Sequence, residues 1–335
     1  MGLGVGVGLT NACDLACAHC YRDPTRVSQL SMVDVMGICD ALPVASMNLG
    51  TGENGLHPDY EGIVAMLAAQ GVKLSLTSNG FTIERSSDET LRRFREIEVS
   101  IDFPTQAEQD AFRGPGNWKR VMAGIERARQ LDVTVTILSV MMRTNYRRLA
   151  EIARLAFAVG ANYRVNVYQP VQTDAFTLSY DEFWEGFRRL LAETRLVSTT
   201  EPVLNAMLGS PFPHGTGCGR RTVRVTPTGD VVPCVYWTTS DVRLRDLKRV
   251  GEDGVLSSPQ FARVRHVPDA CRGCPFIAVC QGGCAGRRQL GGGVEQADPY
   301  CPLVRGKTVA LDWARAESRE LLKTGSACTS VFAPA

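Results

Sequence analysis

The segment Cys13-Asp-Leu-Ala-Cys17-Ala-His-Cys20 decides how the rest of the chain is interpreted. It places three cysteines in one short loop with the spacing C-x3-C-x2-C. Cysteine thiolates are the usual ligands of iron–sulfur clusters, and a 4Fe–4S cluster has four such positions. Three thiolates can therefore hold three irons of a cubane and leave the fourth iron without a protein ligand. An open metal position of this kind is where a small molecule can bind and react.

This cysteine loop resembles the signature of the radical S-adenosylmethionine (SAM) superfamily. The resemblance implies that the amino and carboxylate groups of SAM chelate the open iron. It also implies that one electron from the cluster cleaves SAM to methionine and a 5′-deoxyadenosyl radical, which removes a hydrogen atom from an unactivated carbon. A zinc knuckle or a disulfide pair is the alternative for Cys13, Cys17 and Cys20, but neither accounts for the motifs that follow.

The composition limits the classes of protein to consider. A length of 335 residues predicts about two domains. The formal charge of +2 at pH 7, with no block of basic residues, gives no reason to expect nucleic-acid binding. The sequence shows no export signal and no apolar run of membrane-spanning length, so we expect a cytoplasmic protein without a membrane partner. Twelve cysteines in such a chain favour metal ligands over disulfides.

The first two hundred residues alternate between strand-like and helix-like patterns. The strand-like runs are 5–11, 46–50, 73–78, 98–102, 133–141 and 163–168. The helix-like runs are 32–42, 60–70, 88–94, 118–131, 146–159 and 180–194. Six strand–helix units in this order predict a parallel sheet with right-handed crossovers, and six is fewer than the eight of a closed barrel. We therefore expect an α/β fold with a partial (β/α)6 TIM-like barrel, as the resemblance also implies.

Three regions follow from this pattern and from the cysteines described below. Residues 1–205 form the predicted radical SAM core. Residues 206–305 form a small cysteine-rich domain with a β-hairpin over 222–232, and residues 306–335 form a C-terminal helix and tail, with the helix spanning 303–322. In parallel barrels the chemistry lies at the carboxyl ends of the strands.

The segment Gly50-Thr51-Gly52-Glu53 follows the second predicted strand. It resembles the Gly-Gly-Glu-Pro motif of the superfamily, whose backbone and acid meet the SAM amino group. Thr51 stands in place of the first glycine, and Asn54 stands in place of the proline. The alternative is a plain glycine turn at the end of a strand.

Further cofactor contacts are expected at the ends of the neighbouring strands. Asn79 ends the third strand and is a candidate by its position. By resemblance, Ser100 and Arg113 lie near the SAM carboxylate and ribose, although a solvated Arg113 is the alternative. His19 occupies the position before the third cysteine and is expected to pack against adenine.

A second array of seven cysteines begins at Cys218 and has the spacing C-x10-G-x4-C, then C-x2-C-x5-C-x3-C, then a final cysteine. This array, with Gly229 at the glycine position, resembles the SPASM extension of radical SAM enzymes. A zinc ribbon could use four of these cysteines but would not need the other three. Because the region has little core of its own, we expect it to depend on bound metal for stability.

The resemblance implies two auxiliary 4Fe–4S clusters, and hence three clusters in all. The outer one takes Cys271, Cys274, Cys280 and Cys301. The inner one takes Cys218, Cys234 and Cys284. In some relatives a further cysteine lies about six residues before the first, but Phe212 holds that position here, with His214 nearby. The inner cluster could therefore have an open iron, a His214 ligand or a substrate ligand.

Three residues outside these motifs remain to be interpreted. Cys39 lies in a helical pattern and is predicted to be a core thiol. Cys328 is either a free terminal thiol or, as in radical epimerases, a hydrogen-atom donor to the substrate radical. Asp102, at the end of the fourth strand, is a candidate general base, with a SAM-ribose or helix-cap contact as the alternative.

The reaction we expect is oxidative modification or cross-linking of a ribosomal peptide. The alternative is a dehydrogenase, epimerase or sulfur-inserting enzyme that acts on an aminoglycoside sugar or nucleoside, and a non-catalytic iron–sulfur electron carrier is a third class. Only twelve residues precede Cys13, which leaves no room there for a peptide-binding domain, so a separate protein could supply peptide recognition. A flavodoxin- or ferredoxin-type protein is the expected reductant.

Overall fold

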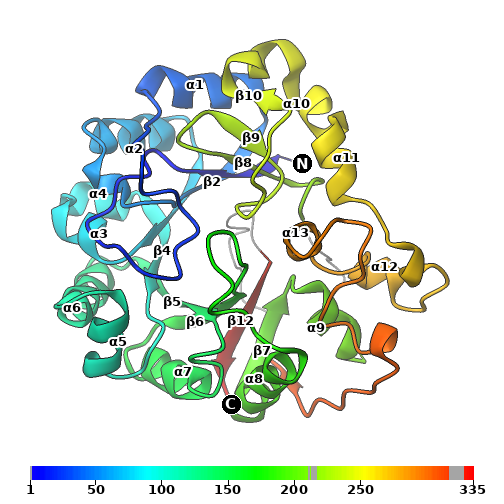
Figure 1. Ribbon diagram of the computed structural model, residues 1–335. Helices are drawn as coiled ribbons and strands as arrows, with labels where there is room; N and C mark the ends of the chain where they lie inside the picture. The colour runs from blue at the N-terminus through cyan, green and yellow to red at the C-terminus, as the bar shows by residue number, and fades with distance from the viewer. Residues whose placement is uncertain (1, 210–211, 213–216, 317–327) are drawn as a thin grey trace.

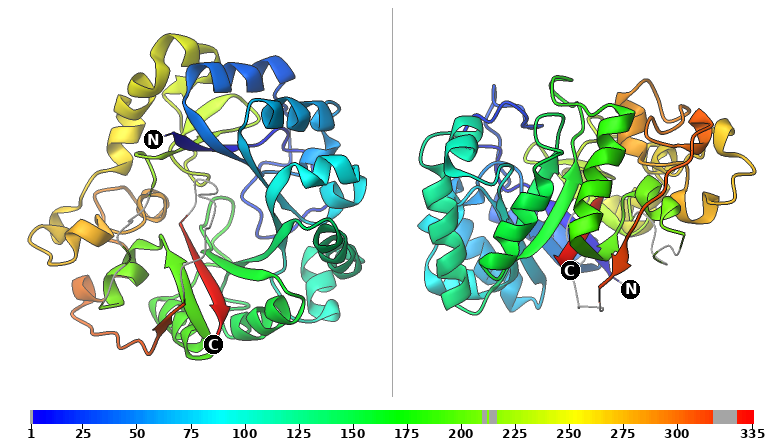
Figure 2. Two further views of the ribbon diagram at one scale, coloured as in Figure 1. Left: turned by 180° about the vertical axis from the view of Figure 1, so that it is seen from behind. Right: turned by 90° about the horizontal axis from the view of Figure 1, so that it is seen from below.

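The computed structural model describes residues 2–209, 212, 217–316 and 328–335. Among these residues, twelve strands form one curved sheet in the order β10-β9-β8-β1-β2-β3-β4-β5-β6-β12-β7-β11. Helices surround the strands as an outer ring, which is seen from the front in Figure 1 and from behind and below in Figure 2.

The six predicted strand–helix units are present, and each strand pairs in parallel with the next. The strands are β1 Leu3–Val7, β2 Val44–Leu49, β3 Lys73–Ser78, β4 Phe94–Ser100, β5 Thr134–Met141 and β6 Asn162–Val167. The helices are α1 Met32–Ala41, α2 Tyr60–Ala69, α4 Asp88–Arg92, α6 Asn117–Gln130, α7 Leu149–Ala158 and α8 Tyr180–Glu193. The predicted partial (β/α)6 barrel is therefore confirmed.

Local sequence explains why these elements form. The strands bury most of their residues between the helices and the barrel interior, as strands of parallel sheets do. Ser31 begins α1 with a capping box that Asp34 completes, and Ser179 and Glu182 do the same for α8. Each box satisfies main-chain groups that the first turn of a helix would otherwise leave without partners.

Several boundaries differ from the predicted ones. Strand β1 ends at Val7, because the chain beyond it turns into the cysteine loop. Strand β4 begins four residues before the predicted start, so the preceding helix ends at Arg92. Two short helices, α3 Phe81–Arg85 and α5 Gln106–Arg113, were not predicted, because each is too short to show a clear periodicity.

The predicted helix over 303–322 is wrong for the part that the structure describes. Residues 303–305 form a single 3₁₀ turn, η4 Leu303–Arg305, which ends at Gly306 with φ 61°. The chain then runs without a helix to strand β11 Ala314–Arg315, which pairs with β7 Thr194–Thr199. Residues 317–322 of this prediction lie outside the described residues. A glycine in the left-handed conformation ends a helix, and the extended segment then packs on the barrel, where Trp313 Nε1 donates to Leu208 O.

The end of the chain is a strand of the sheet and not a free tail. Strand β12 Thr329–Pro334 lies between β6 and β7 and runs antiparallel to both, as its red arrow shows in Figure 2. Its side chains Val331 and Phe332 are buried. The partial barrel is thus extended by a strand that is distant in the sequence.

The cysteine-rich region contains the predicted hairpin, made of β8 Thr222–Val225 and β9 Asp230–Val232, with β10 Val242–Arg243 beside it. Strand β8 pairs in parallel with β1 and so joins this region to the barrel. The remaining helices are α9 Pro202–Met207, α10 Leu247–Ser257, α11 Pro259–Val264, α12 Ile277–Cys280 and α13 Ala285–Leu290, with 3₁₀ turns η1 Asn54–Leu56, η2 Leu244–Asp246 and η3 Asp269–Cys271. Among the described helices, none has the length and apolar character needed to cross a bilayer.

Candidate functional site

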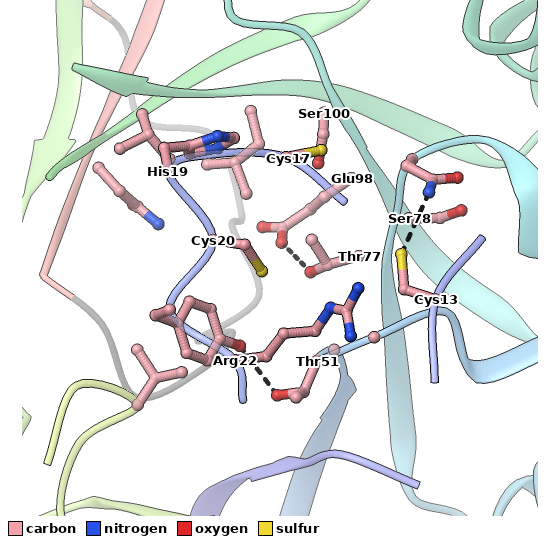
Figure 3. A pocket seen from close by; sticks show the side chains of 18 of the residues that line it. Cys13, Cys17, His19, Cys20, Arg22, Thr51, Thr77, Ser78, Glu98 and Ser100 are labelled. Atoms are coloured by element: carbon pink, nitrogen blue, oxygen red, sulfur yellow. Dashed lines mark hydrogen bonds between the residues drawn. The ribbon is translucent and has the colours of Figure 1, made fainter. Parts of the chain in front are cut away.

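A cavity of about 210 Å³ lies at the carboxyl ends of the barrel strands. Cys13, Cys17 and Cys20 all line it, and Figure 3 shows them around the same space. The predicted cofactor-binding residues that also line it are His19, Gly50, Thr51, Gly52, Glu53, Asn79, Ser100 and Arg113. The structure therefore brings together the first cysteine group and every predicted cofactor residue.

The cysteine loop is held by side chains that bond to its backbone. Arg22 donates to the carbonyls of Asn11 and Leu15, at 3.0 and 2.7 Å. Asn79 Nδ2 lies 3.6 Å from the Cys13 sulfur, and the Cys17 thiol lies 3.7 Å from the carbonyl of Arg113. Burial raises the pKa of Cys13 to about 12 and also raises the pKa of Cys17. A bound metal offsets this cost, because it takes up the thiolate directly.

The loop that contains Thr51 packs closely on the cysteine loop. Thr51 and Gly52 have positive φ angles of 98° and 58°. A Cβ at Gly52 would lie 2.3 Å from Ala12 O, so only glycine allows this approach. Glu53 N donates to the same carbonyl at 2.7 Å. These contacts place the backbone of the Gly50–Gly52 turn at the cavity wall, next to three thiols, which fits a cluster-bound SAM.

Glu53 is buried, and its carboxylate is already surrounded by donors. It accepts hydrogen bonds from Ser78 Oγ at 2.8 Å, from Asn79 N at 2.5 Å, and from both N and Oγ1 of Thr82 at 3.1 and 2.5 Å. Burial raises the pKa of Glu53, while these hydrogen bonds act in the opposite direction. The acid thus holds the turn between β3 and α3 and positions Asn79.

Asp102 does not have the freedom that a general base needs. It is fully buried and does not line the cavity. Its Oδ2 accepts from Nε and Nη2 of Arg113 at 2.8 and 2.6 Å, and its Oδ1 accepts from Val140 N at 2.9 Å. This placement therefore does not fit the predicted role of Asp102 as a general base. Asp102 instead fixes Arg113, which lines the cavity and lies close to the thiols of Cys17 and Cys20.

His19 is a neutral side chain at the cavity wall. Burial lowers its pKa to about 4, even though Asp102 lies 3.6 Å from Nε2 and acts in the opposite direction. The ring stacks on Phe112 with 4.8 Å between centroids. Its Nδ1 is buried and has no hydrogen-bond partner among the described residues, and the same holds for Asn166 Oδ1 and Gln169 Oε1. All three residues line the cavity, so a bound ligand can satisfy them.

The inner wall of the cavity is polar, which was not predicted from the sequence. Arg164 on β6 forms salt bridges with Glu98 at 2.9 Å and Glu96 at 3.2 Å on β4. Thr77 donates to Glu98 at 2.6 Å and accepts from Asn48 at 3.1 Å. The polar wall could have been predicted from the charged residues Glu96, Glu98 and Arg164, which stand inside strands that are otherwise mainly apolar.

The four cysteines predicted for the outer auxiliary cluster surround a second, smaller cavity of about 20 Å³. They are Cys271, Cys274, Cys280 and Cys301. Burial raises the pKa of Cys280 to about 12. Four thiols around one enclosed space form a donor set that fits a 4Fe–4S cluster.

The inner group contains Cys218, Cys234 and Cys284, as predicted, and Cys328 lies with them. A Cβ at Gly286 would lie 3.6 Å from the Cys234 sulfur and 4.0 Å from the Cys284 sulfur. Cys328 forms side-chain hydrogen bonds with Cys218 and Cys284. The alternative ligand His214 lies outside the described residues.

Two further observations complete the placement of the cysteines. Cys39 packs against the core of the barrel, and burial raises its pKa to about 11, as expected of a core thiol. No three His, Cys, Asp or Glu side chains within the described ranges are grouped tightly enough to hold a single metal ion. A cubane spreads its thiolates over the corners of a cube and so requires wider spacing.

Comparison with known proteins agrees with this geometry. The radical SAM superfamily matches residues 7–156, and the SPASM iron–sulfur cluster-binding domain matches residues 217–275.

The chain is a radical SAM enzyme with a SPASM domain.

Similar proteins include the mycofactocin maturase MftC of Mycolicibacterium smegmatis, 26% identical over 322 residues that cover 88% of this chain and 81% of that protein. The PqqA peptide cyclase of Methylocella silvestris is 25% identical over 90% of this chain and 87% of its own length. The crystal structure of SuiB from Streptococcus suis has the same fold, with a TM-score of 0.68 at 15% identity, over 90% of this chain and 77% of SuiB.

These findings confirm the predicted family, fold and cofactors of this radical SAM enzyme. SAM and 4Fe–4S clusters are the cofactors that its two domains imply. The alternatives of a zinc knuckle and a zinc ribbon are thereby set aside. The assignment of individual residues to each cofactor stays a prediction, supported by the cavities described above.

Proposed function

We propose that this enzyme modifies a C–H bond of a ribosomally made peptide. When bound, the first cluster and SAM supply a 5′-deoxyadenosyl radical that removes a hydrogen atom from the substrate. The observation that carries the proposal is the single cavity that contains both the Cys13–Cys20 loop and the polar side chains of the barrel interior. A radical formed beside the cysteine loop would meet a substrate held by those side chains.

In this proposal, different residues bind the cluster, offer backbone contacts to SAM and pack against the adenine. Cys13, Cys17 and Cys20 hold the first cluster, and Asn79 and Arg113 fix the positions of two of these thiols. The turn around Gly52 offers its backbone to SAM. The neutral ring of His19 provides a flat, uncharged surface for the adenine.

The peptide substrate is favoured by the two curated relatives, since one is a maturase and the other is named as a cyclase of the peptide PqqA. The polar wall of Asn48, Glu98, Arg164, Asn166 and Gln169 suits a peptide, because it offers both donors and acceptors to amide groups. A ferredoxin- or flavodoxin-type protein is the proposed reductant, and a separate protein could present the peptide.

The test uses anaerobically reconstituted enzyme with SAM and dithionite. The candidate substrates are peptides encoded by any short reading frames found beside the gene. We expect formation of 5′-deoxyadenosine together with a peptide that has lost two hydrogens, measured by mass spectrometry. If the peptide stays unchanged while an aminoglycoside or nucleoside is modified, the substrate class proposed here is wrong. If no 5′-deoxyadenosine forms at all, the radical reaction itself is excluded.

A further inference from the structure

The main chain at Cys328 is fixed where the C-terminal strand enters the sheet. Thr329 N donates to Thr200 Oγ1 at 3.0 Å, and Thr329 O accepts from Thr200 N at 2.8 Å. Thr200 follows directly after β7. Strand β12 then continues between β6 and β7. The position of Cys328 is therefore set by the barrel, although the residue lies 110 positions after Cys218 in the sequence.

The Cys328 side chain points into the inner cysteine group of the SPASM domain. Its thiol forms hydrogen bonds with those of Cys218 and Cys284. The sulfurs of Cys234 and Cys284 both lie beside Gly286, where the missing side chain leaves room for them. Four thiols from separate parts of the chain thus converge on one place.

We propose that Cys328 is the fourth protein ligand of the inner auxiliary cluster, with Cys218, Cys234 and Cys284. Four thiolates are the complete ligand set of a 4Fe–4S cluster. The inference rests on the iron–sulfur loading of the SPASM domain. It replaces the open iron, the His214 ligand and the substrate ligand considered from the sequence. It also replaces the hydrogen-donor interpretation, because a thiolate bound to iron has no hydrogen atom to give.

A plain core thiol is the competing explanation for Cys328. Cysteines do pack as small apolar groups, and the half-buried Cys39 packs in this way against the barrel core. Cys39, however, packs against the apolar core of the barrel, whereas Cys328 contacts two cysteines of a metal-binding array. None of the described cysteines forms a disulfide.

A buried ion pair holds the two halves of the proposed ligand set together. Glu201, the residue after Thr200, accepts from Arg287 at 2.7 Å. Arg287 lies three residues after Cys284 on α13, and it also pairs with Asp298 at 2.6 Å. The barrel segment that fixes Cys328 and the helix that follows Cys284 therefore share one rigid connection.

This ligand set has a consequence for catalysis. Val235, Tyr236 and Thr329 line the main cavity, and each lies within two residues of a proposed ligand, Cys234 or Cys328. A fully ligated cluster behind this wall has no iron open to the substrate. The inner cluster would then exchange electrons with a substrate in the cavity across the intervening protein, and it would not bind a substrate group.

The experiment compares variants in a background where Cys13, Cys17 and Cys20 are replaced by alanine, so that only auxiliary clusters remain. The full-length chains are reconstituted anaerobically, and iron content and the electron paramagnetic resonance (EPR) spectrum of the dithionite-reduced protein are measured. The background protein should bind about eight irons. Adding Cys328→Ala should reduce this to about four, or retain a cluster with an altered spectrum. Adding Cys39→Ala instead, as the matched control, should change neither quantity.

A second variant covers the possibility that Cys328→Ala fails to fold. Cys328→Ser offers an oxygen ligand of similar size, so it should keep the fold and shift the spectrum of one cluster. Iron content and spectra identical to those of the Cys39→Ala control, for either Cys328 variant, would overturn the proposal. A background protein without iron would instead overturn the loading of the SPASM domain itself. Neither outcome depends on which substrate the enzyme modifies, so a failure of the peptide proposal is a separate result.

Discussion

Arg224 donates a hydrogen bond to the hydroxyl of Thr51, although 173 residues separate them in the sequence. Arg224 also donates to the carbonyl of Gly50. Strand β8 of the SPASM domain thereby contacts the turn that is predicted to bind SAM. The guanidinium is buried and forms no salt bridge with a described carboxylate, and this burial lowers its pKa. The buried positive charge of Arg224 is therefore held in part by two neutral acceptors, Gly50 O and Thr51 Oγ1, on the turn that is predicted to bind SAM.

Replacing Arg224 with leucine should weaken SAM binding. A hydrogen bond to a charged group contributes about 1.5–3 kcal/mol, and the loss of these two bonds frees a turn whose Thr51 has φ 98°. We expect the dissociation constant for SAM to rise about tenfold, which corresponds to about 1.4 kcal/mol. Equilibrium dialysis of the anaerobically reconstituted enzyme measures it.

The matched control for this prediction is Arg220→Leu, because Arg220 is exposed and does not line the cavity. It should leave SAM affinity unchanged. Equal affinity in the Arg224 and Arg220 variants would show that β8 does not support the SAM turn.

Asp102→Asn distinguishes a positioning residue from a base. The amide removes the buried counter-charge of Arg113 while it keeps the size of the side chain. If Asp102 positions Arg113, the KM for SAM rises, and the ratio of modified substrate to 5′-deoxyadenosine stays at the wild-type value. A general base would give the opposite pattern, with 5′-deoxyadenosine still formed and the product ratio reduced. Asp253→Asn, in an exposed part of α10, is the control.

Arg287 should be among the side chains most important for stability. It forms buried ion pairs with Glu201 and Asp298, and its guanidinium lies 4.7 Å from the ring centroid of Tyr300. Removing one partner of a buried ion pair costs about 3–5 kcal/mol, because the charge left behind has no compensation. We expect Arg287→Met to lower the thermal unfolding midpoint strongly and to reduce the iron content.

The control for Arg287 is Arg249→Met on α10. Arg249 pairs with Asp246 at 3.3 Å, but its side chain is 76% exposed, so this pair should contribute little. If both variants unfolded at the same temperature, the buried pairs would have no special role in joining the SPASM domain to the barrel.

Much of the fold could be predicted because its signals are local. The six strand–helix units show their periodicities within short windows. The cysteine groups were equally visible, because the spacing in each loop is a local property. Proximity of the cofactor residues followed from one rule, that parallel strands place their carboxyl ends at the same edge.

The features that were missed depend on contacts between distant parts of the chain. Nothing near Cys328 indicates that β12 enters the sheet between β6 and β7, which places its thiol beside Cys218. The same is true of Arg224, whose partner Thr51 lies in another domain. For Asp102, the position in the sequence predicts the correct edge of the sheet but not the Arg113 that occupies its carboxylate, so a positioning role was not foreseen.

Cys39 is not a predicted cluster ligand, so its rate of alkylation serves as the reference for a free thiol in the folded protein. Alkylation by iodoacetamide requires the thiolate, and burial raises the pKa of Cys39 to about 11. The folded state therefore disfavours this thiolate, and at pH 8 only about one molecule in a thousand carries it. We expect very slow labelling of the native holoenzyme at pH 8, with a rate that rises about tenfold per pH unit until the pH approaches 11.

Removing the iron should make the cluster cysteines accessible to alkylation. Around its inner cysteines the SPASM domain has a small apolar cluster that contains Val232, Trp237 and Val294, so this part should loosen when chelation takes its metal away. Mass spectrometry should then find labels on the cluster cysteines, with Cys328 labelled together with Cys218, while Cys39 in the barrel core stays slow. If Cys328 were labelled in the holoenzyme before any iron is lost, its thiol would be free, and the C-terminal strand would carry no cluster ligand.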